Sequence, residues 1–338
     1  MSPEHSGDDR KGMSSQTISP ALIFDLALNG AGGVVEPSGS GLNGSNPRWI
    51  HLEYSGHDIE EVLGAYEVDP RIVKSLLRED TRPRTAVNRG DVIVFLRAIN
   101  MNRGANAEDM VSLRMLIQKN RVITLRQRKI MAIQDVRESL FEGTGPTSLQ
   151  ELVILVIENL ADRISSFVES LEMDIDEMET AIEQGSSNPE LSTWRSAIFS
   201  IRRQIATVRR YLSPQREALD SLSRLAFELL DRQHVFLLNE QSDRINRSIE
   251  NLHMVNERTL VLQDVINHEV SKIQNARMYL FSVVTVIFLP ISFVTGLFGV
   301  NVQGMPGVNE PLAFWLLLGT LTALSMGSAI LLKRNGYF

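Results

Sequence analysis

The sequence has no cysteine among its 338 residues, which excludes disulfide bonds, thiolate metal sites and thiol redox chemistry. This absence fits a reducing compartment. Residues 1–19 mix charges, serine and glycine and have no apolar run before a small-residue cleavage site, so we expect no signal peptide. The net charge of −7 is modest for this length and argues against a nucleic-acid partner.

Charge is also missing near the C-terminus, where two apolar runs extend from Met278 to Phe298 and from Leu312 to Leu332. A hydrocarbon core about 30 Å thick needs roughly 20 apolar residues of helix, so each run is long enough to cross a bilayer. No Asp, Glu or His occurs between Arg277 and Glu310. We therefore expect a two-pass membrane protein.

The orientation of the two spans follows from the basic residues beside them. Lys272 and Arg277 precede the first span, Lys333 and Arg334 follow the second, and the connecting loop has no Lys or Arg. Because cytoplasmic flanks carry the excess of Lys and Arg, both termini are expected in the cytoplasm and residues 300–311 outside.

The end of the first span carries the most specific motif of the chain. The segment from Phe288 to Asn301 resembles the end of the first transmembrane helix in CorA-type divalent metal transporters, whose signature there is Gly-Met-Asn. Here the motif is Gly299-Val300-Asn301, with valine in place of methionine. The following residues, Gly304 to Gly307, are similar to the ZntB-type zinc transporter branch. The likeness extends upstream through Thr81–Arg84, Leu96–Asn100 and Met110–Arg114.

The resemblance implies a homopentamer in the inner (cytoplasmic) membrane of the cell that transports divalent metal ions, with zinc favoured and proton coupling suggested. It indicates no enzyme and no cofactor other than the transported cation. Two rival functions remain open. One is a CorA-type magnesium, cobalt or nickel channel, and the other is a membrane-anchored scaffold or sensor whose hairpin only tethers its soluble domain.

The predicted fold is an α/β cytoplasmic domain followed by long α-helices that form a funnel or stalk and by two C-terminal transmembrane helices. In chain order we expect a disordered tail (1–19), the α/β domain (20–145), an antiparallel helical hairpin (146–241), a stalk helix continuing into the first span (242–299), an external loop (300–311), the second span (312–332) and a basic C-terminus (333–338). Strands are expected at Ala21–Leu26, Trp49–Leu52, Val92–Leu96 and Val122–Leu125, and helices at Ile59–Arg78 and Ile130–Phe141.

The two arms of the hairpin have opposite charge. Residues 148–184 contain ten acidic residues against one arginine, whereas the second arm carries Arg195, Arg202, Arg203, Arg209, Arg210 and Arg216. One interpretation is mutual salt bridging on solvated faces. The other is that the acidic helix attracts divalent cations towards a pore entrance, and the sequence does not separate the two.

The stalk helix, expected from about Ser242, has neither Pro nor Gly before Pro290. Its apolar stripe comprises Ile245, Ile249, Leu252, Ile266 and Ile273 and predicts packing against other helices. Counting in sevens along the opposite face gives Asp264, Ser271, Met278, Thr285, Ser292 and Gly299. Because polar side chains within a membrane face other helices or water, this face predicts a pore lining. The alternative is that isolated Ser and Thr bond to their own backbone.

The candidate pathway has a lining, a mouth and a set of metal-binding candidates. The lining residues are Asp264, Ser271, Asn275, Met278, Phe281, Thr285, Leu289 and Ser292, and the selectivity mouth is Gly299, Val300 and Asn301. Asn301 would hold a hydrated ion through its neutral oxygen, while Asp264, His268 and Glu310 are the candidates for charged or imidazole ligands and for proton coupling. Two spans cannot surround a path, so several copies must assemble within the lipid bilayer.

Overall fold

The structure is a computed structural model that describes residues 19–35, 46–79, 82–184, 188–226, 229–299, 310 and 312–334. The chain divides into two compact units, which are described separately. The first contains residues 1–185 and 194–261, and the second contains residues 186–193 and 262–338.

A seven-stranded mixed sheet organises the first unit. Its strands follow the order β2-β1-β3-β7-β6-β5-β4. The pairing of β3 with β7 is parallel, whereas the other neighbours in the sheet are antiparallel. The strands are β1 (Leu22–Leu28), β2 (Val34–Val35), β3 (Arg48–Glu53), β4 (Arg84–Asn88), β5 (Asp91–Ala98), β6 (Val111–Gln118) and β7 (Arg121–Arg126).

The four expected strands are confirmed as β1, β3, β5 and β7, and the sequence interpretation missed β2, β4 and β6. The single helix expected from Ile59 to Arg78 is wrong, because two short helices occupy this stretch: α1 (Ile59–Ala65) and α2 (Pro70–Leu76). Glu67 between them has a φ of 51°. The Asp69 side chain then accepts a hydrogen bond from the Arg71 backbone N–H (2.8 Å), which starts α2 with proline at its first position.

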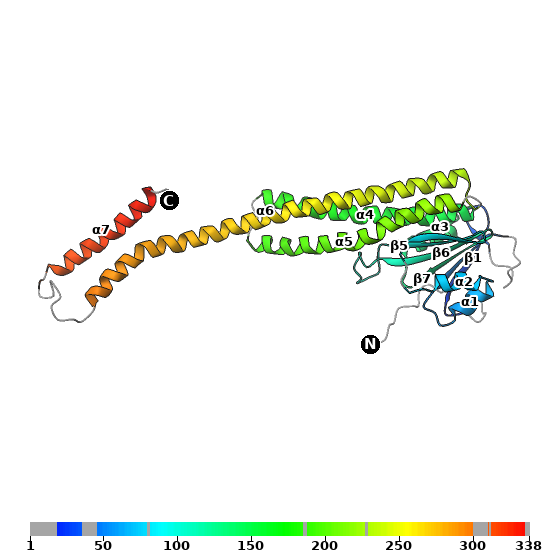
Figure 1. Cartoon of the computed structure of the whole chain (residues 1–338), viewed down its shortest axis with the longest axis horizontal. Coiled ribbons are helices and arrows are strands. Elements are labelled where there is room, and N and C mark those ends of the chain that lie inside the picture. The colour runs from blue at the N-terminus through cyan, green and yellow to red at the C-terminus, as the bar shows by residue number, and fades with distance from the viewer. Residues whose placement is uncertain are drawn as a thin grey trace. The chain divides into compact units, whose positions relative to one another are not determined.

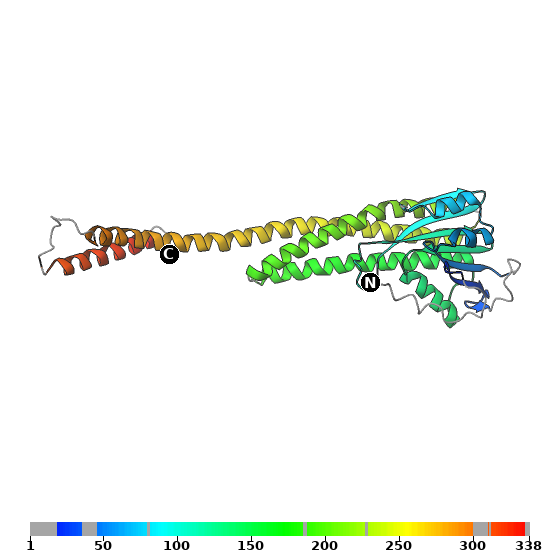
Figure 2. The same ribbon diagram turned by 90° about the horizontal axis from the view of Figure 1, so that it is seen from below.

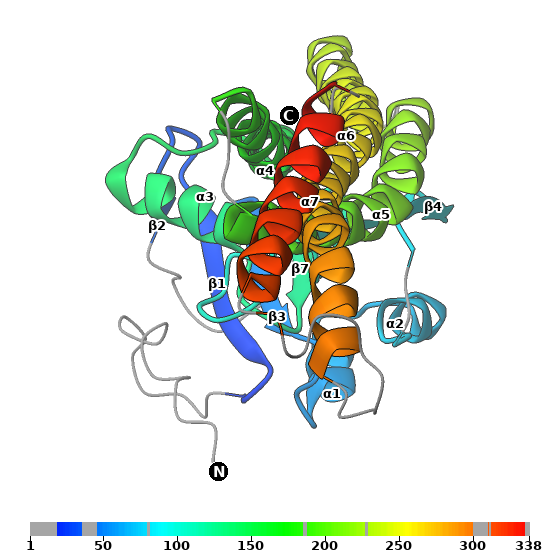
Figure 3. The ribbon, with the colours of Figure 1, turned by 90° about the vertical axis from the view of Figure 1, so that its left-hand side faces the viewer.

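The two faces of the sheet are covered by different helices. On one face, α1 and α2 bury Leu63, Ile72 and neighbouring apolar residues against Ile50, Phe95 and the central strands. On the other face, α4 (Leu149–Glu183) packs on β5 and β7, and α3 (Met131–Glu142) packs beside it. Figure 3 shows α1 and α2 on the side of the sheet away from α4. The expected helix near Ile130–Phe141 is confirmed as α3.

Three long helices run side by side from the sheet (Figures 1 and 2). They are α4, α5 (Asn188–Leu225) and the first part of α6 (Arg232–Gly299). The side chain of Gln215 on α5 accepts a hydrogen bond from the Arg97 backbone N–H (2.7 Å), which ties α5 to β5. The α6 helix begins ten residues before the expected start at Ser242, since the Asp231 carboxylate caps it by accepting from the His234 backbone N–H (2.9 Å).

The second unit contains the rest of α6 and the helix α7 (Ala313–Arg334). As expected, the stalk and the first apolar run form one continuous helix, and Pro290 lies within it without ending it. Its 68 residues correspond to roughly 100 Å at 1.5 Å per residue. Among the described residues, α6 is the helix long and apolar enough to cross a membrane, with a mean hydropathy of 2.3 in its apolar window. The apolar stretch described in α7 is Ala313–Ser328.

Candidate ion pathway

As far as Ile273, the long helix α6 has a buried side and an exposed side that follow a seven-residue repeat. Beyond Ile273, most described side chains of α6 are exposed whichever way they face. Leu252, Val255, Thr259, Leu262 and Ile266 alternate at spacings of three and four and are all buried. This spacing is the pattern of a coiled-coil seam. Of the predicted stripe, Ile245, Leu252 and Ile266 are buried, and Ile249 and Ile273 are half-buried.

The predicted pathway residues of α6 are exposed: those up to Ser271 lie on its exposed side, whereas those from Asn275 onward lie where nearly every face of the helix is exposed. All of them that the structure describes on this helix are exposed in the single chain: Asp264, His268, Ser271, Asn275, Met278, Phe281, Thr285, Leu289, Ser292 and Gly299. Large apolar side chains among them are widely accessible, with 71% of Phe281 and 64% of Leu289 accessible. Apolar exposure of this extent is typical of a surface that contacts lipid or other helices.

Two hydroxyls of this face bond to their own helix. Ser271 Oγ donates to the Asn267 carbonyl and Thr285 Oγ1 donates to the Phe281 carbonyl, both at 2.8 Å. This is the local bonding that the alternative interpretation expects of isolated Ser and Thr. Each hydroxyl oxygen still has lone pairs that point away from the helix, so it can accept a hydrogen bond from a water or from a hydrated ion.

Counting back from Asp264 in sevens reveals acidic residues that the sequence interpretation missed. Glu257, Glu250 and Asp243 occupy the preceding positions of the repeat and are exposed. Glu250 accepts a hydrogen bond from Asn246 Nδ2 (2.8 Å), and Glu257 lies 3.9 Å from His253 Nδ1. We call Asp243, Glu250, Glu257 and Asp264 the acidic column. The signal that would have found it is the same seven-residue count, continued towards the N-terminus.

The mouth motif lies mostly outside the described residues. Gly299 is the last residue of α6, whereas Val300 and Asn301 are not described. Glu310 is described and exposed, and its backbone carbonyl accepts from the Ala313 N–H (3.1 Å) at the start of α7. Within the described part of the chain, no group of three or more His, Asp or Glu residues is placed to hold a metal ion.

The acidic helix α4 forms ion pairs with arginines of α6. Arg258 contacts both Asp176 and Glu179 (Nη2 to Glu179 Oε2, 2.6 Å), and Arg244 pairs with Asp162. These carboxylates raise the pKa of Arg258, chiefly through the hydrogen bond with Glu179. On α5, Arg203 pairs instead with Glu108 (3.1 Å) and Arg216 with Asn246 (2.7 Å). Carboxylates of α4 thus pair with arginines of α6, whereas the hairpin interpretation expected them to pair with arginines of α5.

Comparison with known protein families shows to which family this chain belongs. The family described as "CorA-like Mg2+ transporter protein" matches residues 44–334. The chain belongs to the CorA family. Two similar CorA-family relatives are the divalent cation transporter CmaX of Pseudomonas aeruginosa (33% identity, covering 94% of this chain and 93% of CmaX) and the zinc transport protein ZntB of Pectobacterium carotovorum (32% identity, 93% and 95%).

A solved structure of full-length CmaX shares the CorA fold with this chain. The TM-score is 0.76 at 32% identity, and the likeness covers 98% of this chain and 99% of the CmaX chain. The expected CorA-type resemblance is therefore confirmed, as is the order of a sheet domain followed by long helices. The matched length includes the sheet, the helices and the apolar C-terminal segments.

Proposed function

We propose that this protein transports divalent metal cations, with zinc favoured, along a central path of a homo-oligomer, for which five copies are the favoured number. The single observation that carries the proposal is the seven-residue repeat on α6, which lies on the exposed side of the helix as far as Ser271. It runs from the acidic column through Ser271 into the apolar segment at Thr285 and Ser292. A scaffold whose hairpin only anchors it has no need of polar groups in that register.

The proposed topology has two spans, α7 being the second, with both termini in the cytoplasm of the bacterial cell and the loop around Asn301 outside. The acidic column would raise the local concentration of cations on the cytoplasmic side. Neutral oxygens of Ser, Thr and Asn301 would bind the waters of a hydrated ion without holding it too tightly to leave. Met278, Phe281 and Leu289 would form the apolar constrictions.

Zinc selectivity has to act on the hydrated ion or reside in the stalk. A dehydrated zinc ion prefers His, Cys or carboxylate ligands, and the apolar segment of α6 offers none of them. Asp264, His268 and Glu310 are the nearest such groups and are also the candidates for proton coupling. The magnesium, cobalt or nickel channel is kept as the second candidate because the matched family is described by magnesium transport.

Ion flux into liposomes tests the proposal. The purified protein, after confirmation of its oligomeric state in mild detergent, would be reconstituted and supplied with zinc, magnesium, cobalt or nickel, with and without a pH gradient. We expect flux of zinc above the other ions. Flux of magnesium alone would favour the channel, while absence of flux for every ion would support the scaffold. A monodisperse monomer that moved metal would reject the central path.

A further inference from the structure

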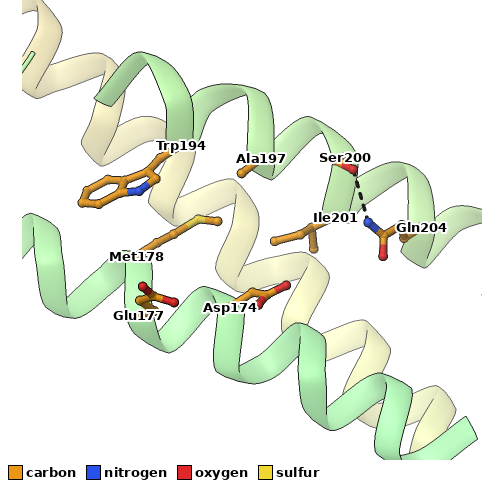
Figure 4. A pocket seen from close by; sticks show the side chains of 8 residues that line it. All are labelled: Asp174, Glu177, Met178, Trp194, Ala197, Ser200, Ile201 and Gln204. Carbon is orange, nitrogen blue, oxygen red and sulfur yellow. Dashed lines mark hydrogen bonds between the residues drawn. The ribbon is translucent and has the colours of Figure 1, made fainter. Parts of the chain in front are cut away.

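A cavity of about 400 Å³ lies between α4 and α5 in the first unit. Asp174 and Glu177 line it from α4, and Trp194 and Ile201 line it from α5 (Figure 4). Ser200 and Gln204 at one end bond to each other, with Gln204 Nε2 donating to Ser200 Oγ at 3.2 Å. The proposed ion pathway uses none of these residues.

The two carboxylates of this cavity are not neutralised. Asp174 and Glu177 lie one helical turn apart, and neither has a hydrogen bond or ion pair in the described part of the chain. Burial raises the pKa of Asp174, and the charge of Glu177 adds to the shift. A cation placed between them would relieve both effects.

The remaining walls favour a particular kind of cation. Two carboxylates from one helix supply fewer oxygen ligands than the six or more that calcium takes, and they do not form the octahedral set that magnesium requires. Trp194, Met178 and Ile201 instead offer an aromatic ring and apolar surface. A guanidinium pairs with carboxylates and stacks on an indole, and its methylene stem packs on apolar walls. The cavity chemistry therefore fits an arginine side chain.

The chain itself carries arginines that lack partners. Arg195 and Arg209 on α5 are exposed and make no hydrogen bond or ion pair within the described residues. Pairing within one chain thus leaves two carboxylates and two arginines unmatched on the same pair of helices. When two copies meet, an arginine of one copy can neutralise the carboxylates of the other.

We propose that the cavity between α4 and α5 is a contact between subunits, in which Arg195 or Arg209 of a second copy enters between Asp174 and Glu177 and stacks on Trp194. The inference rests on the oligomer of the proposed function. Since the cavity and the arginines are different surfaces of each copy, the contact can repeat head-to-tail from one copy to the next and close into a ring, as the proposed oligomer requires.

Disulfide trapping tests this contact, because the chain has no native cysteine. Two differently tagged forms would be co-expressed, one with Glu177→Cys and the other with Arg195→Cys or Arg209→Cys, and oxidised in membranes. We expect a mixed dimer for at least one of these pairs. Glu169→Cys is the matched control, since Glu169 is exposed on the same helix two turns away, and it should cross-link to neither arginine position.

Charge reversal provides the second measurement. Glu177→Arg should raise the concentration at which half of the oligomer dissociates by about tenfold, and adding Arg195→Glu and Arg209→Glu should restore it. If the oligomer is intact but no mixed dimer forms and Glu177→Arg has no effect on dissociation, the proposed contact is rejected while the proposed function stands. If the unmodified protein is a monomer, the proposed function fails, and the contact fails with it.

Discussion

At the scale of single residues, His51 is an imidazole that the fold keeps neutral. It is fully buried on β3, and its Nδ1 lies 2.8 Å from Thr124 Oγ1, which also accepts a hydrogen bond from Trp49 Nε1 (3.0 Å). Burial lowers the pKa of His51 well below its usual value, and the charges of Arg126 and Arg137 lower it further. Protonation therefore favours the unfolded chain.

The resulting prediction concerns acid stability. An unfolded histidine titrates near pH 6.5, so the unfolded state binds the proton first as the pH falls. Stability is unaffected above that pH and is lost below it, by at most about 1.4 kcal/mol per pH unit, until the lowered folded pKa is reached. Thermal unfolding of the full protein in detergent should show a smaller decrease in Tm between pH 7.5 and 5.5 for His51→Phe than for the unmodified chain.

The exposed His253 supplies the control for this experiment. His253→Gln should leave the acid sensitivity as it is in the unmodified chain, because 60% of that side chain is accessible. An equal decrease in Tm for His51→Phe and the unmodified protein would contradict the assignment of the effect to His51.

The second prediction at this scale concerns Asn301. Asn301→Ala removes the proposed carboxamide at the outer mouth and should abolish metal flux in liposomes while leaving expression and oligomer size nearly unchanged. Asn309→Ala, in the same loop, is the matched control and should transport normally. Normal flux through the Asn301 variant would remove that residue from the pathway.

At the scale of elements, the strands that the sequence predicted are short runs composed mainly of apolar residues. Val92 to Leu96, in β5, is wholly apolar, whereas the other three runs each contain one polar residue: Asp25 in β1, His51 in β3 and Thr124 in β7. The strand β6 was missed because Arg114 lies in its centre, where it is buried, caps α2 through the Leu76 carbonyl and stacks on Tyr54 (3.6 Å). The sequence alone cannot reveal that the charge of a buried arginine is stabilised by an aromatic ring and by a carbonyl at the end of a helix.

The edge strand β4 and the break between α1 and α2 were missed for other reasons. Residues Arg84–Asn88 have little burial, so β4 depends on pairing with β5 rather than on an apolar pattern. The break did have a local signal, because Asp69 followed by Pro70 is the signature of a helix start. Apolar residues continue at helical spacing on both sides of the break, so the sequence predicted one helix instead of two.

The acidic column of α6 gives a prediction at this scale. Asp264→Asn should lower flux most at low metal and low salt, because exposed carboxylates concentrate cations only where ionic screening is weak. Glu269→Gln is the control, since Glu269 pairs with Lys272 (2.6 Å) outside the column. A ratio of variant flux to unmodified flux that did not change with salt would place Asp264 outside the conduction path.

At the scale of the whole molecule, the sequence indicated the pathway only in part. The seven-residue count found the face from Asp264 to Gly299 but began at Asp264, beside the apolar segment. It therefore did not include Glu257, Glu250 and Asp243, although all three lie within the expected stalk helix. The cavity around Trp194 could not be found in this way, since it depends on which side chains of α4 and α5 face each other across the hairpin.

Topology is the prediction at this scale. In intact cells, a cysteine at Val308 should react with an impermeant thiol reagent added outside, whereas a cysteine at Ser271 should react only after permeabilisation. The reason is the position of Lys and Arg around the two apolar runs. Labelling of both positions from the same side would overturn the proposed orientation.

The single parallel pair of the sheet also constrains the order in which the chain acquires its structure. Arg48 on β3 lies opposite Arg121 on β7, a separation of 121 − 48 = 73 residues, whereas β4 to β7 pair with sequence neighbours. Closing the longer loop costs more conformational entropy, so we expect the meander β4–β7 to form first and β1–β3 to dock onto β7 afterwards. Since the last strand ends at Arg126, the ribosome has made every residue of the sheet about 150 residues before it makes the apolar segment of α6.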